Sequence, residues 1–372
     1  MIYLDNTATT PLLPEVIDEM NRIFKQAWGN PSSIHSIGQI AKAELESARN
    51  TIASVLSAKS SEIYFTASAT EGIGLMIPNI IKKNQIQHII TSPIEHSAVL
   101  KTIQHCESVE VHMLDLDKNG AFKLSNLEDK LSHCKGNKLV VLMHANNEIG
   151  TLLPFKKVSE LCLQYEALLF CDMVQTIGKY DISFSKTNVD FAVASAHKFH
   201  GPKGAGILYI KSGRNYPPMI FGGGQEREMR SGTENVPAIA GMAKAIELAK
   251  KDLTSRSQHI QHLKSYFTER IKEEIPDIKF NGNSQNGGLY TLINISLPLK
   301  ISPEVLNMKL DMAGLSASQG SACSSGVMKN SSVIQYLYGE NRNALRLSFS
   351  FLNTIHEIEQ AVDILKNIVH KK

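Results

Sequence analysis

Several polar side chains follow short apolar runs of the sequence and could act together on one ligand. Asp172 directly follows the apolar run 168–171, and Gln175 lies about one turn beyond it, so both side chains can face the same ligand. Lys198 comes shortly after the apolar run 191–194. Open α/β sheets bind their ligands at the carboxyl ends of the strands. These three side chains therefore predict one site that combines a carboxylate, a carboxamide and an amine.

A segment of small polar residues, 66–71, can complete that site by holding an anion. It follows the apolar run 63–65 and enters a predicted helix, whose first backbone amides are free to bind a phosphate. An anion cradle, a carboxylate such as Asp172 and an amine such as Lys198 are the parts that pyridoxal phosphate requires. The lysine forms a Schiff base with this cofactor, and the aspartate keeps the pyridine nitrogen protonated so that the ring accepts electrons. We therefore expect pyridoxal 5'-phosphate as the cofactor.

One of the five cysteines differs from the others in its surroundings. The five are odd in number, scattered and without a Cys-x-x-Cys pair, so their spacing indicates neither a zinc site nor a disulfide framework. Four are expected to pack as small hydrophobic side chains: Cys106, Cys134, Cys162 and Cys171. Cys323 instead lies among small and polar residues, 318–326, as expected of an exposed loop. It is the first candidate nucleophile, and no metal is expected at the site.

Composition, charge and missing motifs exclude several other classes of protein. The 372 residues are 42% hydrophobic and 20% charged, which is typical of globular proteins, and the length suits two domains. With 39 basic and 36 acidic residues the formal charge is +3, so nucleic acid is not an expected partner. No apolar run approaches the ~20 residues that span a bilayer, and a signal-peptide pattern is missing, so we expect a cytoplasmic protein without a membrane partner. The sequence also lacks the motifs of P-loops, Rossmann dinucleotide sites, serine hydrolases and zinc proteases.

Hydrophobic periodicity predicts the elements that would position these side chains. Apolar residues at helical spacing predict an amphipathic helix over 36–57. Short apolar runs then alternate with helical patterns, which is typical of a mainly parallel sheet with helices on both faces. The predicted strands are 63–65, 89–91, 139–144, 168–171 and 191–194, and helices are predicted near 70–81, 95–105 and 155–166.

The C-terminal part of the chain has a different pattern. A long helical region, 237–272, changes character near 253–257 and leads into a predicted smaller α+β domain. The elements of that domain are expected near 289–297, 303–313, 344–350 and 355–369. We expect a large cofactor-binding domain over 13–255 and a small domain made of 1–12 and 256–372, which carries the Cys323 loop.

The sequence resembles the cysteine desulfurases, a family of fold-type I pyridoxal phosphate enzymes with class V aminotransferase ancestry. The resemblance runs nearly from end to end of the chain. It rests on the segments 3–11 (YLDNTATTP), 29–35 (GNPSSIH), 95–96 (EH), 144–150 (HANNEIG), 172–175 (DMVQ), 195–198 (SAHK), 230–233 (RSGT), 320–323 (GSAC) and 344–348 (ALRLS). It implies the fold-type I α/β architecture, with a mainly parallel central sheet and a smaller α+β domain.

The resemblance also implies a role for each candidate residue. Lys198 would bind the cofactor covalently, and His96 would stack on the pyridine ring and carry protons. Asp172 would bind the ring nitrogen, and Gln175 the phenolic oxygen. The remaining cofactor contacts, most of them to the phosphate, would come from Ala69, Thr70, Asn147, Ser195, His197 and, from a partner subunit, Thr233. The last contact implies an obligate homodimer.

The substrate side of the site follows from the same resemblance. Asn147 and Arg346 would hold the substrate carboxylate, a task that suits a bidentate guanidinium. The implied reaction converts L-cysteine to L-alanine and leaves a persulfide on Cys323. Sulfur would pass from there to an acceptor protein, such as an iron–sulfur scaffold or a tRNA-thiolation enzyme. A selenocysteine lyase or another class V aminotransferase-like enzyme is the alternative, and for it Cys323 would be dispensable.

Overall fold

A seven-stranded sheet forms the centre of the larger part of the molecule. The computed structural model describes residues 1–320, 331–339 and 342–370. The sheet has the strand order β2-β8-β7-β6-β5-β3-β4. The strands are β2 (Ile63–Thr66), β3 (His88–Thr91), β4 (Glu110–Met113), β5 (Lys138–Met143), β6 (Leu168–Asp172), β7 (Phe191–Ser195) and β8 (Gly206–Ile210). Strand β8 is antiparallel to both of its neighbours, whereas the pairs from β7 to β4 are parallel. The expected mainly parallel sheet is therefore confirmed.

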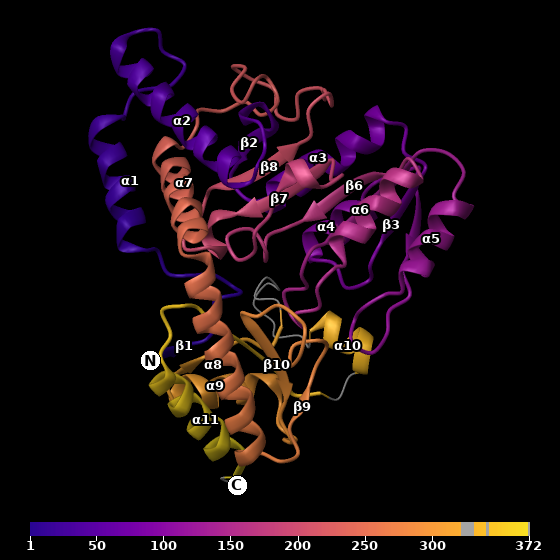
Figure 1. Cartoon of the computed structure of the whole chain (residues 1–372), viewed down its shortest axis with the longest axis vertical. Helices are drawn as coiled ribbons and strands as arrows, with labels where there is room; N and C mark the ends of the chain where they lie inside the picture. The colour runs from indigo at the N-terminus through magenta and orange to yellow at the C-terminus, as the bar shows by residue number, and fades with distance from the viewer. Residues whose placement is uncertain (321–330, 340–341, 371–372) are drawn as a thin grey trace.

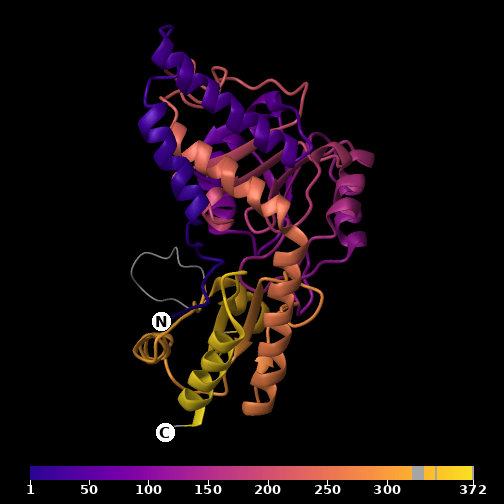
Figure 2. The same cartoon turned by 60° about the vertical axis from the view of Figure 1, so that its left-hand side comes forward.

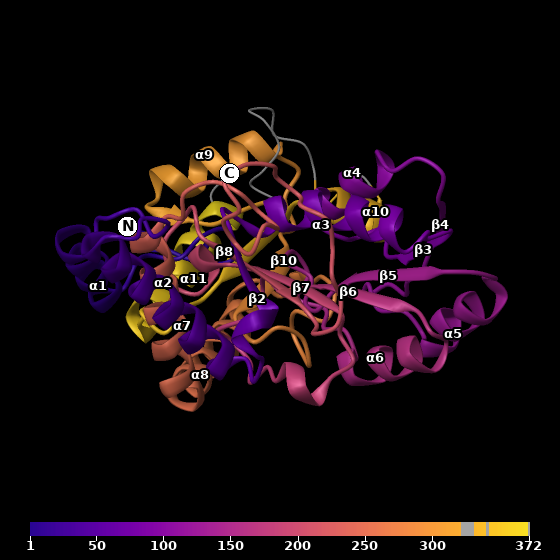
Figure 3. The ribbon, with the colours of Figure 1, turned by 90° about the horizontal axis from the view of Figure 1, so that it is seen from above.

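Helices cover both faces of this sheet, as Figure 3 shows. On one face lie α3 (Ala69–Lys83) and α4 (Ser97–Gln104), and on the other lie α2 (Ser36–Val55), α5 (Leu124–His133), α6 (Phe155–Gln164) and α7 (Val236–Lys251). Along β5, Leu139 and Val141 pack toward the first group, while Val140 and Leu142 pack toward the second. All four are buried, and burial of such a side chain contributes about 1.5–3 kcal/mol. This two-sided burial explains why the strands are continuously apolar.

A smaller three-stranded sheet carries the second part of the molecule. Its strand order is β12-β10-β9, with β9 (Lys279–Phe280), β10 (Leu292–Ser296) and β12 (Ala344–Ser348). Two further short strands, β1 (Ile2–Tyr3) and β11 (Leu315–Ser316), pair in parallel. Three helices pack nearby: α8 (Leu253–Glu274), α9 (Pro303–Met312) and α11 (Ile355–His370). Figures 1 and 2 show α8 leading from the end of α7 down alongside this part, which also holds both chain ends.

The N-terminal segment belongs to the smaller core although it begins the chain. Ile2 and Leu4 pack in one cluster with Leu345 of β12 and Phe267 of α8. The chain then crosses to the larger part, where α1 (Pro14–Gln26) packs against α7. The domain bounds expected above, 13–255 against 1–12 with 256–372, remain a prediction.

Most sequence-predicted elements agree with the structure to within a few residues. The helix predicted over 36–57 is α2, and the helical region 237–272 divides at Asp252 into α7 and α8. The remaining described helix is α10 (Ser332–Tyr338), and short 3₁₀ turns lie at Ser60–Glu62, Phe184–Lys186 and Ala196–Lys198. Within the described ranges, no helix has both the length and the apolar character needed to cross a bilayer.

Candidate active site

A pocket lies where the carboxyl ends of β6 and β7 approach the smaller sheet. Strand β6 ends at Asp172, and strand β7 ends at Ser195, three residues before Lys198. Strand β12 contributes Arg346 from the other side. The pocket brings together ten of the residues singled out in the sequence: Ala69, Thr70, His96, Asn147, Asp172, Gln175, Ser195, His197, Lys198 and Arg346.

The amine of Lys198 is presented to the pocket by a short turn. This 3₁₀ turn, Ala196–Lys198, directly follows β7, so the lysine is placed by a buried strand. Its Nζ donates hydrogen bonds to the backbone carbonyls of Thr7 and Ala8, both at 2.8 Å. The N-terminal segment therefore helps to hold the amine in place.

Asp172 places a buried carboxylate in the same pocket. Burial raises the pKa of Asp172, whereas the positive charges of His96 and Lys198 and the N–H of Val174, which donates to Oδ1 at 3.0 Å, lower it. A cation bound next to this carboxylate would favour its ionised form. A protonated pyridine nitrogen is such a cation, so Asp172 fits the role implied for it.

His96 caps helix α4 while it lines the pocket. Its Nδ1 accepts a hydrogen bond from the backbone N–H of Ala98 at 3.1 Å. An acceptor nitrogen carries no proton, so Nε2 carries it in the neutral ring. The cap thus fixes both the ring and the nitrogen that can exchange a proton.

Glu95, immediately before His96, is a buried carboxyl group that the sequence does not mark as unusual. Burial raises the pKa of Glu95 well above its ordinary value, and the nearby negative charge of Asp172 adds to the effect. Its Oε2 atom has no hydrogen-bond partner among the described residues. A backbone hydrogen bond at Met143 opposes this shift, but burial dominates and favours the neutral form of Glu95.

The turn into helix α3 is held rigidly by side chains. Ser68 caps the helix, since its Oγ accepts a hydrogen bond from the N–H of Glu71 at 3.2 Å. Glu71 Oε2 in turn accepts from the N–H of Ala67 at 3.0 Å, and its Oε1 pairs with Arg230 Nε at 2.7 Å. Gly72 allows this helix to lie against β7, because a Cβ there would come within 3.0 Å of Val193. The start of α3 is therefore a preformed cradle for an anion.

Ser195, the last residue of β7, and His197, in the turn after it, also line the pocket. Ser195 Oγ accepts a hydrogen bond from the N–H of Ala69 at 2.8 Å, which leaves its hydroxyl proton to be donated elsewhere. His197 Nδ1 lies 3.2 Å from Thr9 Oγ1. Burial, with nearby positive charges including Lys198, lowers the pKa of His197 to about 4. At neutral pH His197 is therefore a neutral ring that can donate one hydrogen bond.

Gln175 is fixed from both ends of its amide. Its Oε1 accepts a hydrogen bond from Lys179 Nζ at 2.9 Å, and its Nε2 donates to the carbonyl of Thr7 at 3.2 Å. Burial, reinforced by the charge of Lys198, lowers the pKa of Lys179 to about 7. Lys179 does not line the pocket but holds the amide of Gln175, a contact that sequence reasoning missed; its position one turn after Gln175 was the available signal.

Arg346 is almost fully buried, with 2% of its surface exposed. Its Nη2 pairs with Asp5 Oδ1 at 2.9 Å, and its Nη1 donates to the backbone carbonyl of Asn147 at 3.0 Å. The Nε atom is buried and has no partner among the described residues. An unsatisfied donor of this kind costs about 1–3 kcal/mol, so the guanidinium is poised for an anion. Asp5 was not expected from the sequence.

Two sequence-predicted residues are not among those that line the pocket. Thr233 lies in an exposed stretch just before α7, although Arg230 ties that stretch to Glu71 at the start of α3. Cys323 lies outside the described residues. Conversely, the pocket includes Thr7 and Ala8, which sequence reasoning had not assigned to it, together with Ser68 of the expected anion-binding segment 66–71.

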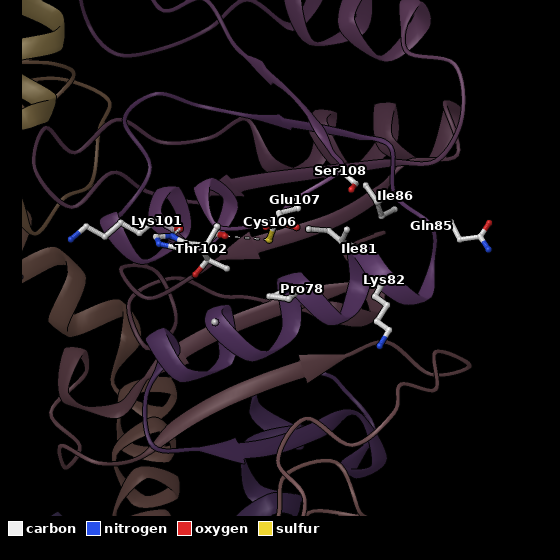
Figure 4. A pocket seen from close by; sticks show the side chains of 12 residues that line it. Pro78, Ile81, Lys82, Gln85, Ile86, Lys101, Thr102, Cys106, Glu107 and Ser108 are labelled. Atoms are coloured by element: carbon white, nitrogen blue, oxygen red, sulfur yellow. Dashed lines mark hydrogen bonds between the residues drawn. The ribbon is translucent and has the colours of Figure 1, made fainter.

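A broader groove lies elsewhere, between α3 and α4, and Figure 4 shows its lining. It is formed by side chains such as Pro78, Ile81, Lys82 and Thr102, and the polar groups in it are mostly at its rim. None of the sequence-predicted site residues lines it within the described part of the chain. The convergence of charged and polar groups thus distinguishes the pocket at β6 and β7 as the candidate active site.

The residues present in this pocket fit pyridoxal phosphate. The capped start of α3, with Ser195 and His197, can hold a phosphate, and the buried carboxylate of Asp172 can hold a protonated ring nitrogen. Lys198 supplies the amine. Arg346 Nε, which has no hydrogen-bond partner among the described residues, is a donor that fits the carboxylate of a substrate.

Comparisons with known proteins agree with this chemistry. The family model Aminotransferase class-V matches residues 2–361. The cysteine desulfurase IscS of Dictyoglomus turgidum is 37% identical over 377 residues, which cover 100% of this chain and 95% of the relative. The putative cysteine desulfurase IscS 1 of Bacillus subtilis is 35% identical, covering 100% of this chain and 99% of the relative.

Solved structures agree as well. A NifS-like protein superimposes with a TM-score of 0.90 at 34% identity and covers 99% of this chain and 98% of its own. A NifS-like protein from Rickettsia africae gives a TM-score of 0.89 at 30% identity, with 99% of each chain covered. A structure of SspA in complex with cysteine gives a TM-score of 0.80 at 28% identity and covers 95% of this chain and 100% of its own. The match along the whole length, in sequence, fold and pocket, means that the chain belongs to the class V aminotransferase family and, within it, to the pyridoxal-phosphate-dependent cysteine desulfurases.

Proposed function

We propose that the protein removes sulfur from L-cysteine, releases L-alanine and leaves a persulfide on Cys323. The observation that carries this proposal is the pocket itself. Lys198 and Asp172 line it, and Arg346, whose Nε has no partner in the described part of the chain, reaches it from the smaller sheet. A cofactor site and a site for a substrate carboxylate are thus within one pocket. Related proteins named cysteine desulfurase, and the SspA structure with cysteine, support cysteine as the substrate.

Pyridoxal phosphate supplies an electron sink that makes the bonds around the substrate α-carbon labile. The chain supplies the contacts that hold it. Asp172 would pair with the ring nitrogen, and Gln175 Nε2, oriented by Lys179, would donate to the phenolic oxygen. Ser195, His197 and the start of α3, with Ala69 and Thr70, all line the pocket and would hold the phosphate.

Proton movement is assigned to two side chains of the pocket. Lys198 Nζ would bind the cofactor and, once displaced by the substrate amine, carry the substrate α-proton. His96 has Nδ1 occupied by the Ala98 amide, so Nε2 is its proton-exchanging atom. Histidine can gain and lose a proton near neutral pH, as this role requires.

The substrate carboxylate would bind at Arg346 and Asn147. The Nε–H of Arg346 is available, and its Nη atoms are already held by Asp5 and the Asn147 carbonyl. A guanidinium fixed in this way orients a carboxylate without loss of side-chain freedom. The substrate would then be held by its amine and its carboxylate, leaving the sulfur to be presented to the nucleophile.

Cys323 is the proposed nucleophile. Its thiolate attacks the sulfur of cysteine, a sulfur–sulfur bond forms, and the carbon–sulfur bond breaks with its electron pair staying on carbon. That carbon takes up a proton, which completes alanine, and the persulfide remains on Cys323. The step needs a free thiolate, which suits the reducing conditions of a cytoplasmic location. An acceptor protein, such as an iron–sulfur scaffold or a thiolation enzyme, would then take the sulfur.

A homodimer is the proposed assembly. Thr233 is exposed in this chain, so its side chain is accessible to the phosphate site of a second copy. Large apolar side chains are also exposed, among them Trp28 at 69%, Ile34 at 94% and Phe221 at 84%. Exposed apolar side chains of this size are typical of surfaces that become buried in an assembly.

The test is to supply the purified holoenzyme with L-cysteine and to measure alanine and reductant-released sulfide together. Equal amounts of alanine and sulfide are expected, and both should be lost in Cys323→Ser while cofactor content stays the same. Cys106→Ser, at a partly buried cysteine outside the pocket, is the matched control. Sustained persulfide formation by Cys323→Ser would contradict the proposed nucleophile. Turnover of selenocysteine alone, independent of Cys323, would instead favour the selenocysteine lyase reading.

A further inference from the structure

A cluster of metal-ligating side chains lies at the amino ends of β3 and β4, whereas the active-site pocket lies at carboxyl ends of the sheet. His88 begins β3, His112 lies on β4, and Cys134 is the C-cap residue directly after helix α5. The two imidazole nitrogens and the thiol sulfur all lie within 4.8 Å of one another. Three elements that are separated in sequence therefore direct these ligand atoms at one point.

The hydrogen bond of His88 to a backbone carbonyl sets which of its ring nitrogens keeps a lone pair toward the cluster. His88 Nε2 lies 2.9 Å from the backbone carbonyl of Lys135, which can only accept, so Nε2 carries the proton. In the neutral ring, Nδ1 then presents a lone pair toward His112 Nε2, 3.1 Å away. A histidine whose outer N–H donates to a backbone carbonyl while its inner nitrogen points into a cluster has the arrangement typical of metal ligands.

Glu110, the first residue of β4, places a carboxylate beside the two histidines of this cluster. Its Oε2 lies 3.3 Å from His88 Nδ1, and its Oε1 lies 3.7 Å from His112 Nε2. A carboxylate oxygen and an imidazole lone pair repel each other unless a cation or a proton lies between them.

The geometry and the donor set match zinc. A tetrahedral site with metal–nitrogen distances of about 2.0–2.1 Å separates neighbouring nitrogen or oxygen ligands by about 3.3 Å. The contacts among His88, His112 and Glu110 span 3.1–3.7 Å, close to that value. Two neutral imidazoles, one thiolate and one carboxylate would balance the charge of a divalent ion. The amine of the nearby Lys138 donates hydrogen bonds to the backbone carbonyls of Cys134 and Gly136.

We propose that His88, His112, Cys134 and Glu110 bind one divalent transition metal ion, with zinc as the best match. The ion would join the edge strand β4 and the end of α5 to β3. Strand β4 has an unpaired edge and mostly exposed side chains, so it lacks the burial that holds the inner strands. Such a metal link would stabilise this edge of the sheet and would take no part in the desulfurase reaction.

The first test measures zinc in the purified holoenzyme after exposure to zinc and dialysis, by elemental analysis. The expected result is about one zinc ion per chain more in the wild type than in His112→Ala or Cys134→Ser. Cys106→Ser is the control and should retain the zinc. The Cys106 thiol lies in the groove of Figure 4 and donates a hydrogen bond to the Thr102 carbonyl at 3.2 Å, so it is not part of the cluster. Equal zinc content in the wild type and in Cys134→Ser would overturn the proposal.

The second test does not depend on the folding of those variants. X-ray absorption of zinc-loaded Cys323→Ser holoenzyme, whose proposed nucleophilic thiol is absent, should show one sulfur and two imidazole ligands on the zinc. Added zinc should also raise the midpoint of thermal unfolding, and chelator should reverse that rise. Zinc ligation without sulfur, or an unfolding midpoint that zinc does not move, would contradict a stabilising site at this cluster.

Discussion

Arg346 of β12 pairs with Asp5, a residue 341 positions away in the sequence, at 2.9 Å. The pair joins the N-terminal segment to the smaller sheet at the wall of the active-site pocket. Two residues further on, the carbonyl of Thr7 accepts hydrogen bonds from both Lys198 and Gln175. The first residues of the chain thus connect the proposed substrate-binding arginine to the proposed cofactor-binding residues.

Arg346→Lys should weaken substrate binding. A lysine cannot contact Asp5, the Asn147 carbonyl and a substrate carboxylate together, because it has a single nitrogen. Loss of one charge-assisted hydrogen bond, worth about 1.5–3 kcal/mol, corresponds to a rise in KM for cysteine of about tenfold to a hundredfold. Steady-state alanine production measures this, with Arg270→Lys on the exposed side of α8 as control. An unchanged KM in Arg346→Lys would show that the carboxylate binds elsewhere.

Lys198→Arg should abolish covalent attachment of the cofactor. The guanidinium keeps the positive charge and can still reach the Thr7 and Ala8 carbonyls, but it does not form an imine under these conditions. Borohydride reduction followed by peptide mass analysis should find the cofactor on Lys198 in the wild type and on no peptide of the variant. Turnover should fall by about 10²–10⁴-fold or more, the range for loss of a proton-transferring group. Lys203→Arg, at a nearby exposed lysine, is the control, and a labelled peptide without Lys198 would refute the assignment.

Glu95→Gln should change how stability depends on pH. Burial raises the pKa of Glu95, so the folded protein keeps a proton that the unfolded chain loses above its ordinary value of 4.5. The stability from this group is therefore fully present at low pH and is lost as pH rises toward the folded pKa, by up to about 1.4 kcal/mol per pH unit. Glutamine is neutral at every pH and removes this loss.

Denaturant unfolding of the wild type and Glu95→Gln at pH 5 and pH 8 measures the effect. The free energy of unfolding of Glu95→Gln minus that of the wild type should be larger at pH 8 than at pH 5. Glu107→Gln, at an exposed glutamate that follows α4, should show no such gain. Parallel pH dependence of the wild type and Glu95→Gln would indicate that Glu95 is ionised in the folded protein.

Local sequence patterns were sufficient to predict the core of the site. Asp172 and Lys198 were found because each follows a continuously apolar run, and such runs become buried parallel strands whose carboxyl ends meet at one edge. The pairing of β6 with β7 then brings the two residues into one pocket. The start of α3 was found for the same reason, since small polar residues between a strand and a helix predict an anion cradle.

Contacts between distant segments were decided only by the tertiary structure. A sequence pattern records which face of an element is apolar, but it does not record which distant segment packs there. The pairing of Asp5 with Arg346 depends on the N-terminal segment joining the small core, and the lowered pKa of Lys179 depends on burial beside Lys198. The spacing of the cysteines likewise indicated no metal site. The side chains of His88, His112 and Cys134 lie close together because β3 pairs with β4 in parallel and α5 ends beside them. No local sequence pattern records this proximity.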